Sequence, residues 1–255
     1  MTQNNSPESS TLITLRDERI LKELMAGACP FQHLSEKLWI YFTSEHAMRQ
    51  RLAQLASSDH IESRLYPDSK TGAKFALYVL GSAGIEYLTE LGYTADEIRT
   101  LLPSPHTVPH ELVVTDVVRR LRHESLQMSY GLKYYDDPAC RAHKKLLGLR
   151  APIPDLLVEI KLRDVPKSHR ILIEIHMGTQ PVLEVVDKVL KQEHVTLFLC
   201  STRESLTALR AAMQEHSKLQ GMVYFSLIYD FFENQGGIFG NNYTTVDGKS
   251  VSLYQ

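Results

Sequence analysis

The sequence is poor in cysteine and has no long apolar run. Its three cysteines, Cys29, Cys140 and Cys200, are far apart and show no CxxC spacing, which argues against a disulfide framework and against a zinc site. No uncharged apolar run approaches the ~20 residues of a membrane span. The first ten residues, MTQNNSPESS, lack the basic and apolar regions of a secretory signal. We therefore expect a cytoplasmic protein without a membrane partner.

A basic excess is also missing, since 28 Lys and Arg residues stand against 30 Asp and Glu residues and the net charge is -2. This balance argues against a uniformly basic surface for nucleic acid. Basic residues do gather between residues 117 and 150, either as a track for phosphate groups or as solvated helix faces. The residues of this segment that we assign to DNA contacts are Arg119, Arg120, Lys144 and Lys145.

Prolines divide the chain at one place. The segment LLPSPHTVPH, residues 101–110, has three prolines in seven residues, and proline interrupts helices and removes a backbone donor. With 255 residues the chain is long enough for two domains of ordinary size. The predicted parts are a disordered tail at residues 1–10, a winged helix DNA-binding domain at 11–101, a proline-rich linker at 102–109, an α/β domain at 110–232 and a tail at 233–255. In the last part, VDGKS is a turn signal for a terminal hairpin, with an exposed docking strand as the alternative.

The first half of the chain has the pattern of three helices followed by a hairpin. Apolar residues at helical spacing predict helices at residues 16–26 and 32–41 and a third helix from Ser44 onward. Two extended segments, HIESRLY and KFALYVL, flank the turn-rich loop PDSKTGA. This order predicts a winged helix-turn-helix, with a further packing helix at residues 82–91.

The third helix has one apolar and one polar face. Met48, Leu52 and Leu55 form the stripe that we expect to pack on the core. Side chains on the opposite face can contact base edges or phosphates, and lysines at the hairpin tip can contact phosphates. The predicted DNA contacts of this half are His46, Arg49, Gln50, Gln54, Lys70 and Lys74. A protein-interaction module built from the same elements is the alternative.

The second half alternates helices with apolar runs. A helix at residues 111–122 precedes GLKYYD, two strands that carry acids, a helix at 181–192, the strand VTLFLC, a helix at 204–215 and the strand MVYFSLIY. This order predicts a mixed sheet covered by helices, which is an α/β layered domain, and an α+β class for the whole chain. One sequence does not determine the order of the strands.

The two acid-containing strands lie in PDLLVEIKLRDVPKSHRILIEIH, residues 154–176. Side chains alternate across a strand, so Glu174 and His176 share one face of the second strand. If the loop turns around Val165 and Pro166, antiparallel pairing sets Asp155 across from His176 and diagonal to Glu174, within roughly 5 to 8 Å. Carboxylates on a half-buried sheet are unfavourable unless a cation lies between them.

A divalent metal ion explains this placement of acids. Asp155 and Glu174 are the predicted ligands of Mg²⁺ or Mn²⁺, which prefer oxygen ligands. His176 then shuttles a proton, ligates the metal or donates a hydrogen bond to Asp155. The alternative explanations are exposed strand faces and a buried salt-bridge cluster, whose cations would be Lys161, Arg163 or Arg170.

The helix that follows the prolines begins with a histidine and a glutamate. If this helix packs over the end of the sheet, Glu111 is a further metal ligand and His110 is a general base or a phosphate contact. Glu111 also has a simpler explanation, since a carboxylate at a helix start is favoured by the helix dipole. The predicted catalytic residues are His110, Glu111, Asp155, Glu174 and His176, and the predicted metal ligands are Asp155, Glu174 and Glu111.

The motifs PD at residues 154–155 and EIH at 174–176 resemble the PD-(D/E)XK nuclease fold, with His176 where lysine is usual. A wider likeness covers most of the chain. RDERILKEL, AMRQRLAQL and HELVVTDV, together with PD and EIH, resemble the plasmid replication-relaxation family and the MobC-class mobilisation relaxases. The His-Glu pair and downstream aspartate of those relatives match His110, Glu111 and Asp116. The resemblance implies a restriction-endonuclease-like second domain and nicking of a transfer origin with a divalent metal.

Two hypotheses of different classes follow. The first is a metal-dependent strand-nicking protein of a plasmid or other mobile element, acting in conjugative mobilisation or replication. Its partners would be double-stranded DNA at an origin or operator, other relaxosome or coupling proteins, and a second copy of the chain. The alternative is a winged-helix regulator or relaxosome accessory factor with a catalytically inactive second domain.

Overall fold

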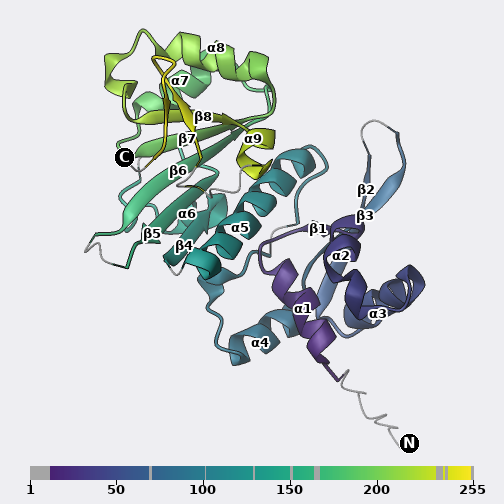
Figure 1. Ribbon diagram of the computed structural model, residues 1–255. Coiled ribbons are helices and arrows are strands. Elements are labelled where there is room, and N and C mark those ends of the chain that lie inside the picture. The colour runs from purple at the N-terminus through teal and green to yellow at the C-terminus, as the bar shows by residue number, and fades with distance from the viewer. Residues whose placement is uncertain are drawn as a thin grey trace, which may run out of the picture. The chain divides into compact units, whose positions relative to one another are not determined.

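The structure is a computed structural model (Figure 1), and it describes residues 12–68, 71–100, 102–128, 130–149, 152–163, 167–233, 238 and 241–253. The chain forms two compact units that divide between Thr115 and Asp116. The expected disordered tail at residues 1–10 and the predicted DNA contact Lys70 lie outside the described residues. Among the described residues, the helices are all too short or too polar to cross a membrane.

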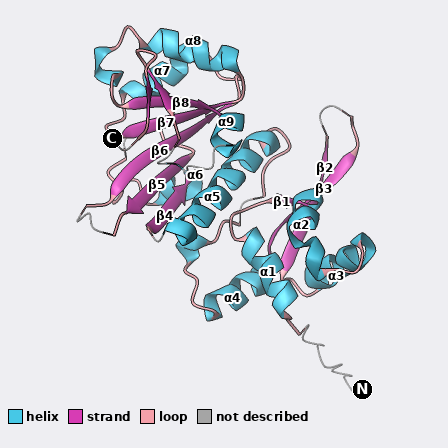
Figure 2. Ribbon diagram, viewed as in Figure 1, coloured by secondary structure: helices cyan, strands magenta, loops and turns pink. Residues whose placement is uncertain are grey.

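The first unit has the element order of a winged helix. Its three-stranded antiparallel sheet has the order β1-β3-β2, and the helices precede and follow the hairpin (Figure 2). The predicted order of three helices and a hairpin is therefore present; the short strand β1 was not expected. The elements are α1 Leu15–Leu24, β1 Cys29–Pro30, α2 Phe31–Leu38, the 3-10 turn η1 Trp39–Tyr41, α3 Glu45–Ser57, β2 Ile61–Pro67, β3 Lys74–Leu80, α4 Ser82–Glu90 and η2 Ala95–Glu97.

Capping and one buried ion pair fix the helices of this unit. Thr14 and Asp17 form a capping box at the start of α1. Asp17 is fully buried, and its carboxylate accepts hydrogen bonds from Arg51 of α3 at 2.6 and 2.8 Å. Burial alone would raise the pKa of Asp17, but the hydrogen bonds from Arg51 and Thr14 outweigh it and lower that pKa below its usual value. The ion pair thus ties α3 to α1.

The second unit contains a seven-stranded mixed sheet. Its strand order is β10-β9-β8-β7-β6-β5-β4, in which β6, β7 and β8 are parallel and the other neighbours are antiparallel. The elements are α5 Val108–Met128, which crosses the division between the units, β4 Gly131–Asp136, α6 Asp137–Ala142, β5 Leu156–Lys161, β6 His169–His176, α7 Val182–Leu190, β7 Val195–Cys200, α8 Arg203–Met213, η3 Ser217–Leu219, β8 Val223–Leu227, α9 Ile228–Glu233, β9 Tyr243–Thr245 and β10 Ser250–Val251.

The sheet confirms the expected mixed type but corrects several elements. The apolar run MVYFSLIY was predicted to be one strand, yet β8 ends at Leu227 and α9 begins at Ile228. The prediction failed because a short apolar run has no periodicity that separates strand from helix. The tail forms the predicted terminal hairpin, in which β9 pairs with β10.

Helices α7 and α8 cover one face of the parallel strands. Val185 and Val189 of α7 pack with Leu209 of α8 against Phe198 and Phe225 of the sheet. Along the same sheet face, Leu157 and Leu172 pack with the segment that follows α6. This packing places Glu174 of β6 beneath α7, since Glu174 is level with Phe198 in the parallel pair.

Gly84 provides a test of the packing in the first unit. A methyl group at Gly84 would lie 2.1 Å from the carbonyl oxygen of His60, far inside contact distance. Alanine normally stabilises a helix relative to glycine by about 1 kcal/mol. We expect the opposite sign here, a loss of about 1 to 3 kcal/mol of unfolding free energy in Gly84→Ala because of overpacking. Urea denaturation measures it, and Gly131→Ala, where the nearest atom is 3.5 Å away, is the control.

Candidate functional site

The polar face of α3 lies at the surface of the first unit. The Ser44 hydroxyl caps the helix by accepting a hydrogen bond from the Ala47 N–H at 3.1 Å. Met48, Leu52 and Leu55 are buried as predicted. The opposite face, comprising His46, Arg49, Gln50 and Gln54, is exposed. The helical periodicity of the sequence therefore identified the exposed face correctly.

Two of these four side chains already have partners. The Arg49 guanidinium pairs with Glu45 at 2.6 Å and lies 3.7 Å from the centre of the Phe31 ring. Gln54 accepts a hydrogen bond from Arg51 at 2.8 Å. In the part of the chain that the structure describes, His46 and Gln50 form no side-chain hydrogen bond. These two side chains are therefore available to a ligand.

The β2–β3 hairpin follows α3 in the sequence and carries exposed basic residues. Pairing runs from Ile61 opposite Leu80 to Pro67 opposite Lys74. Lys74 is exposed, as predicted for the hairpin. Arg64 of β2 is exposed too, and the sequence analysis did not identify it. The polar run ESR inside an extended segment could have identified it, because a strand that is covered on one face normally alternates apolar and polar residues.

The basic residues between 117 and 150 separate into two groups. Arg119 pairs with Asp116 at 2.8 Å, and Arg120 pairs with Glu124 while donating to the carbonyl oxygen of Phe232 at 3.0 Å. These two guanidinium groups are engaged within the second unit, so we leave both out of the proposed DNA surface. By contrast, Lys144 and Lys145 line a surface hollow in the loop after α6, and Lys145 is exposed.

The acids of β5 and β6 meet in a register other than the predicted one. Leu156 pairs with Ile173, so the antiparallel register places Asp155 level with Glu174 and not with His176. The prediction was wrong by two residues because it assumed that the loop turns around Val165 and Pro166, whereas the observed pairing is centred one residue earlier in the chain. The Asp155 carboxylate accepts a hydrogen bond from the Ile175 N–H at 2.7 Å. Asp155 and Glu174 thus lie together at one end of the strand pair.

Glu174 is buried, with 5% of its surface exposed, and it has a cationic partner. The ammonium group of Lys188 on α7 donates to its carboxylate at 2.6 Å. Lys188 was not among the residues predicted for this site, although its position on the helix gives a signal. Lys188 stands three residues after Val185 and directly before Val189 of the buried stripe, a position from which a lysine can reach beneath its own helix.

His176 completes the end of β6 as a neutral side chain. Only 3% of its surface is exposed, and burial lowers the pKa of its imidazole below the usual value. The ring is therefore uncharged at neutral pH, where one nitrogen is a donor and the other an acceptor. Nearby, Cys140 and Cys200 are buried free thiols whose pKa burial raises to about 12. Free thiols agree with the prediction from cysteine spacing that the chain has no disulfide framework.

His110 and Glu111 belong to the first unit, whereas the acids of β5 and β6 belong to the second. Glu111 pairs with Arg99 at 3.2 Å, and the ring of His110 lies 3.5 Å from the other oxygen of Glu111. Arg99 is buried and also donates to Ala26 and Thr115. Glu111 therefore neutralises a buried guanidinium that holds the start of α5 to the rest of its unit.

Asp155 and Glu174 are the two acids that meet at the end of the strand pair. Within the described ranges, the structure contains no set of three His, Cys, Asp or Glu side chains placed to hold a metal ion. Asp155 and Glu174 supply two carboxylates, of which Glu174 already has the Lys188 ammonium as its counter-ion. The cation that compensates the buried charge of Glu174 in this structure is therefore Lys188.

These features define a two-unit protein with a winged-helix first unit and a mixed-sheet second unit. Replication-relaxation is the family whose sequence model matches residues 36–195, and the chain belongs to that family. Among solved structures, Bacillus subtilis PadR in complex with operator DNA is 14% identical in sequence, with 54% of this chain and 81% of that chain covered and a TM-score of 0.25. No curated protein sequence matches.

The Lys188–Glu174 ion pair gives a prediction about stability. Lys188→Met leaves a buried carboxylate without its cation, and we expect a loss of about 3 kcal/mol in the free energy of unfolding. Replacing both partners, in Lys188→Met with Glu174→Leu, should recover most of that loss, because no charge then remains to be compensated. Urea denaturation measures all three proteins.

Lys191 is the matched control on the same helix. It pairs with Asp187 at the surface, where both side chains are more than half exposed. An exposed pair contributes little, so Lys191→Met should change stability by less than about 1 kcal/mol. Equal effects at Lys188 and Lys191 would contradict the assignment of a buried ion pair.

Proposed function

We propose that this replication-relaxation protein binds duplex DNA through its first unit, at an origin or operator, and acts in replication or mobilisation. The observation that carries the proposal is the exposed face of α3, on which His46 and Gln50 are unengaged and lie beside Arg49. Family membership supports the role in replication or mobilisation. The docking arrangement proposed is α3 in the major groove and the β2–β3 hairpin along the backbone.

The chemistry of α3 suits base recognition. A glutamine amide forms two hydrogen bonds with adenine, and arginine binds guanine or phosphate. Gln50 and Gln54 stand one helical turn apart, so both can reach successive base pairs from one groove. Arg49 gains rigidity from its contacts with Glu45 and Phe31, which lowers the entropy lost on binding.

Phosphate contacts in this proposal come from a few local cations. Arg64 and Lys74 of the hairpin are exposed, while the whole chain has a net charge of -2. Few phosphate contacts imply a shallow dependence of affinity on salt. Relaxosome or coupling-protein partners and a homodimer remain predictions from the sequence.

The DNA-binding proposal is tested by variants of α3. With the DNA that flanks the native gene as the probe, His46→Ala and Gln50→Ala should each weaken binding about tenfold while leaving binding to sheared DNA unchanged, because base contacts specify the site. Lys74→Ala should weaken binding to both DNAs and lower the salt slope by about 1. Fluorescence anisotropy at several salt concentrations measures these effects.

The control is Gln214→Ala, which removes an exposed glutamine at the end of α8 in the second unit. It should bind like the parent. If His46→Ala and Gln50→Ala also bind the flanking DNA like the parent, α3 is not the reading helix and the proposal fails.

A second candidate function is metal-dependent strand nicking at the carboxylates of the second unit. It is favoured by one observation, the placement of Asp155 beside Glu174 on adjacent strands. Lys188 supplies, from α7, a basic group that the Glu-x-His sequence lacks. Mg²⁺ or Mn²⁺ would share the site with that ammonium group, and the two carboxylates are the ligands that such ions prefer. The alternative is an accessory factor or regulator with an inactive second unit.

A nicking assay separates these two alternatives. Supercoiled plasmid that carries the flanking DNA is incubated with Mg²⁺ or Mn²⁺ and with the parent, Glu174→Ala or Lys191→Met protein. Open circles from the parent and Lys191→Met, but not from Glu174→Ala, would support nicking at this site. Binding of the plasmid without metal-dependent nicking by the parent would support the accessory role. Calorimetry with Mn²⁺ and Asp155→Ala then tests whether any metal binding uses the same acids.

A further inference from the structure

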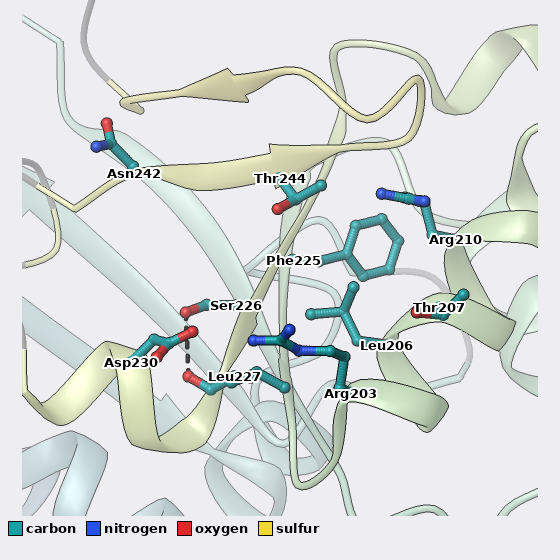
Figure 3. A pocket seen from close by; sticks show the side chains of 10 residues that line it. All are labelled: Arg203, Leu206, Thr207, Arg210, Phe225, Ser226, Leu227, Asp230, Asn242 and Thr244. Carbon is teal, nitrogen blue, oxygen red and sulfur yellow. Dashed lines mark hydrogen bonds between the residues drawn. The ribbon is translucent and has the colours of Figure 1, made fainter.

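A pocket of about 280 Å³ lies in the second unit, away from the acids of β5 and β6 in sequence (Figure 3). Its walls come from α8, from the end of β8 with the start of α9, and from β9. The carboxyl end of parallel strand β8 opens into it. In α/β sheets, ligands bind in the crevice outside the carboxyl ends of the parallel strands. The topology therefore places the pocket where such a sheet accommodates a ligand.

Two arginines of α8 dominate the charge of this pocket. Arg203 and Arg210 are seven residues apart, which places them on one face of the helix, and Figure 3 shows both side chains extending from α8 toward the pocket, with Leu206 and the Phe225 ring between them in this view. Neither guanidinium pairs with an acid among the residues that the structure describes. Arg210 lies against Gly248 of the β9–β10 turn, where a methyl group would be 3.5 Å from its Nη1.

The rest of the pocket combines apolar and uncharged polar groups. Phe225 is fully buried and provides an apolar wall, beside Leu206. Thr207 lies between the two arginines along α8, and Asn242 and Thr244 line the side formed by β9. Hydroxyl and amide groups of this kind supplement guanidinium groups in holding phosphate oxygens, while an apolar wall accommodates a planar ring.

Asp230 adds a negatively charged group to the pocket. It comes from α9, lines the pocket and is exposed, yet it forms no ion pair with Arg203 or Arg210. A carboxylate repels phosphate but accepts hydrogen bonds from hydroxyl groups, as acidic residues do with the sugar of nucleotides. The two arginines and Asp230 thus match different parts of one ligand.

We propose that this pocket binds a phosphate-bearing ligand of nucleotide size, with its phosphate held by Arg203 and Arg210. A guanidinium group binds phosphate oxygens through paired, charge-assisted hydrogen bonds, and each arginine can supply one such group. The volume of about 280 Å³ lies near the lower limit of roughly 300 Å³ for small-molecule pockets, which favours a ligand no larger than one nucleotide. The phosphate has two sources, a free mononucleotide or the 5′ end of a DNA strand.

Binding is measured by calorimetry on the full chain with four probes: adenosine 5′-monophosphate, adenosine, and a short single-stranded oligonucleotide with and without a 5′-phosphate. The parent should prefer phosphorylated probes over their unphosphorylated counterparts. Arg203→Ala and Arg210→Ala should each weaken binding of the phosphorylated probe about tenfold, because each removes charge-assisted hydrogen bonds. Arg203→Lys should lie between the parent and Arg203→Ala, since it keeps the charge and loses the fork geometry.

Arg163→Ala is the matched control, because Arg163 is an exposed arginine of the same unit that does not line the pocket. It should bind like the parent. Thermal melting without ligand checks that each variant is folded. The milder Arg203→Lys change keeps the test valid if an alanine variant is unstable.

The outcomes distinguish a free nucleotide from a DNA end. They also distinguish failure of the phosphate pocket from failure of duplex binding by α3. Phosphate-dependent binding of adenosine 5′-monophosphate that requires both arginines identifies a free nucleotide; the same requirement with the oligonucleotide alone identifies a DNA end. No phosphate preference in the parent, or equal binding by the arginine variants, overturns the proposal. His46→Ala leaves the pocket intact, so a failure of duplex binding by α3 and a failure of the nucleotide pocket are seen independently.

Discussion

The second unit depends on the compensation of one buried charge. Glu174 lies in β6, an interior strand of the sheet, under α7, where a carboxylate has almost no access to water. The 2.6 Å contact with Lys188 supplies the cation and at the same time fixes α7 over β6. A buried carboxylate without a partner costs several kcal/mol, so the packing of α7 and the ionic state of the site are coupled. Any metal at this position acts within that coupling.

The first unit also contains a buried carboxylate that is paired with a cation, and this pairing leaves the other polar residues of α3 at the surface. Arg51 turns inward to meet the buried carboxylate of Asp17, and this pair anchors α3 to α1. The remaining polar residues of α3 then point outward from a helix that cannot rotate about its axis. Rigid presentation of side chains is what reading of a DNA groove requires. In α3, Arg51 therefore holds the helix to α1, while His46 and Gln50 remain exposed.

The sequence predicted the parts of this architecture that depend on local periodicity. The buried stripe of α3 and its exposed opposite face, the winged-helix order and the mixed sheet with a terminal hairpin all follow from spacings within a few residues. The apolar run after Met222 shows the limit of that reasoning, because its strand stops at Leu227 and a helix begins. Periodicity is uninformative where every residue of a run is apolar.

What the sequence determined by itself is which residues face inward on each element and that acids occur on two adjacent strands. Only the tertiary structure decided which groups meet. The register that sets Asp155 level with Glu174 depends on the path of the loop between β5 and β6, and the partners Lys188 and Arg99 come from segments distant in sequence. Pairs of this kind are selected by the burial of whole faces, because an unpaired charge is tolerated in water and not in the core. Local spacing can show that a lysine such as Lys188 borders a buried stripe, but it does not identify the acid that the lysine meets.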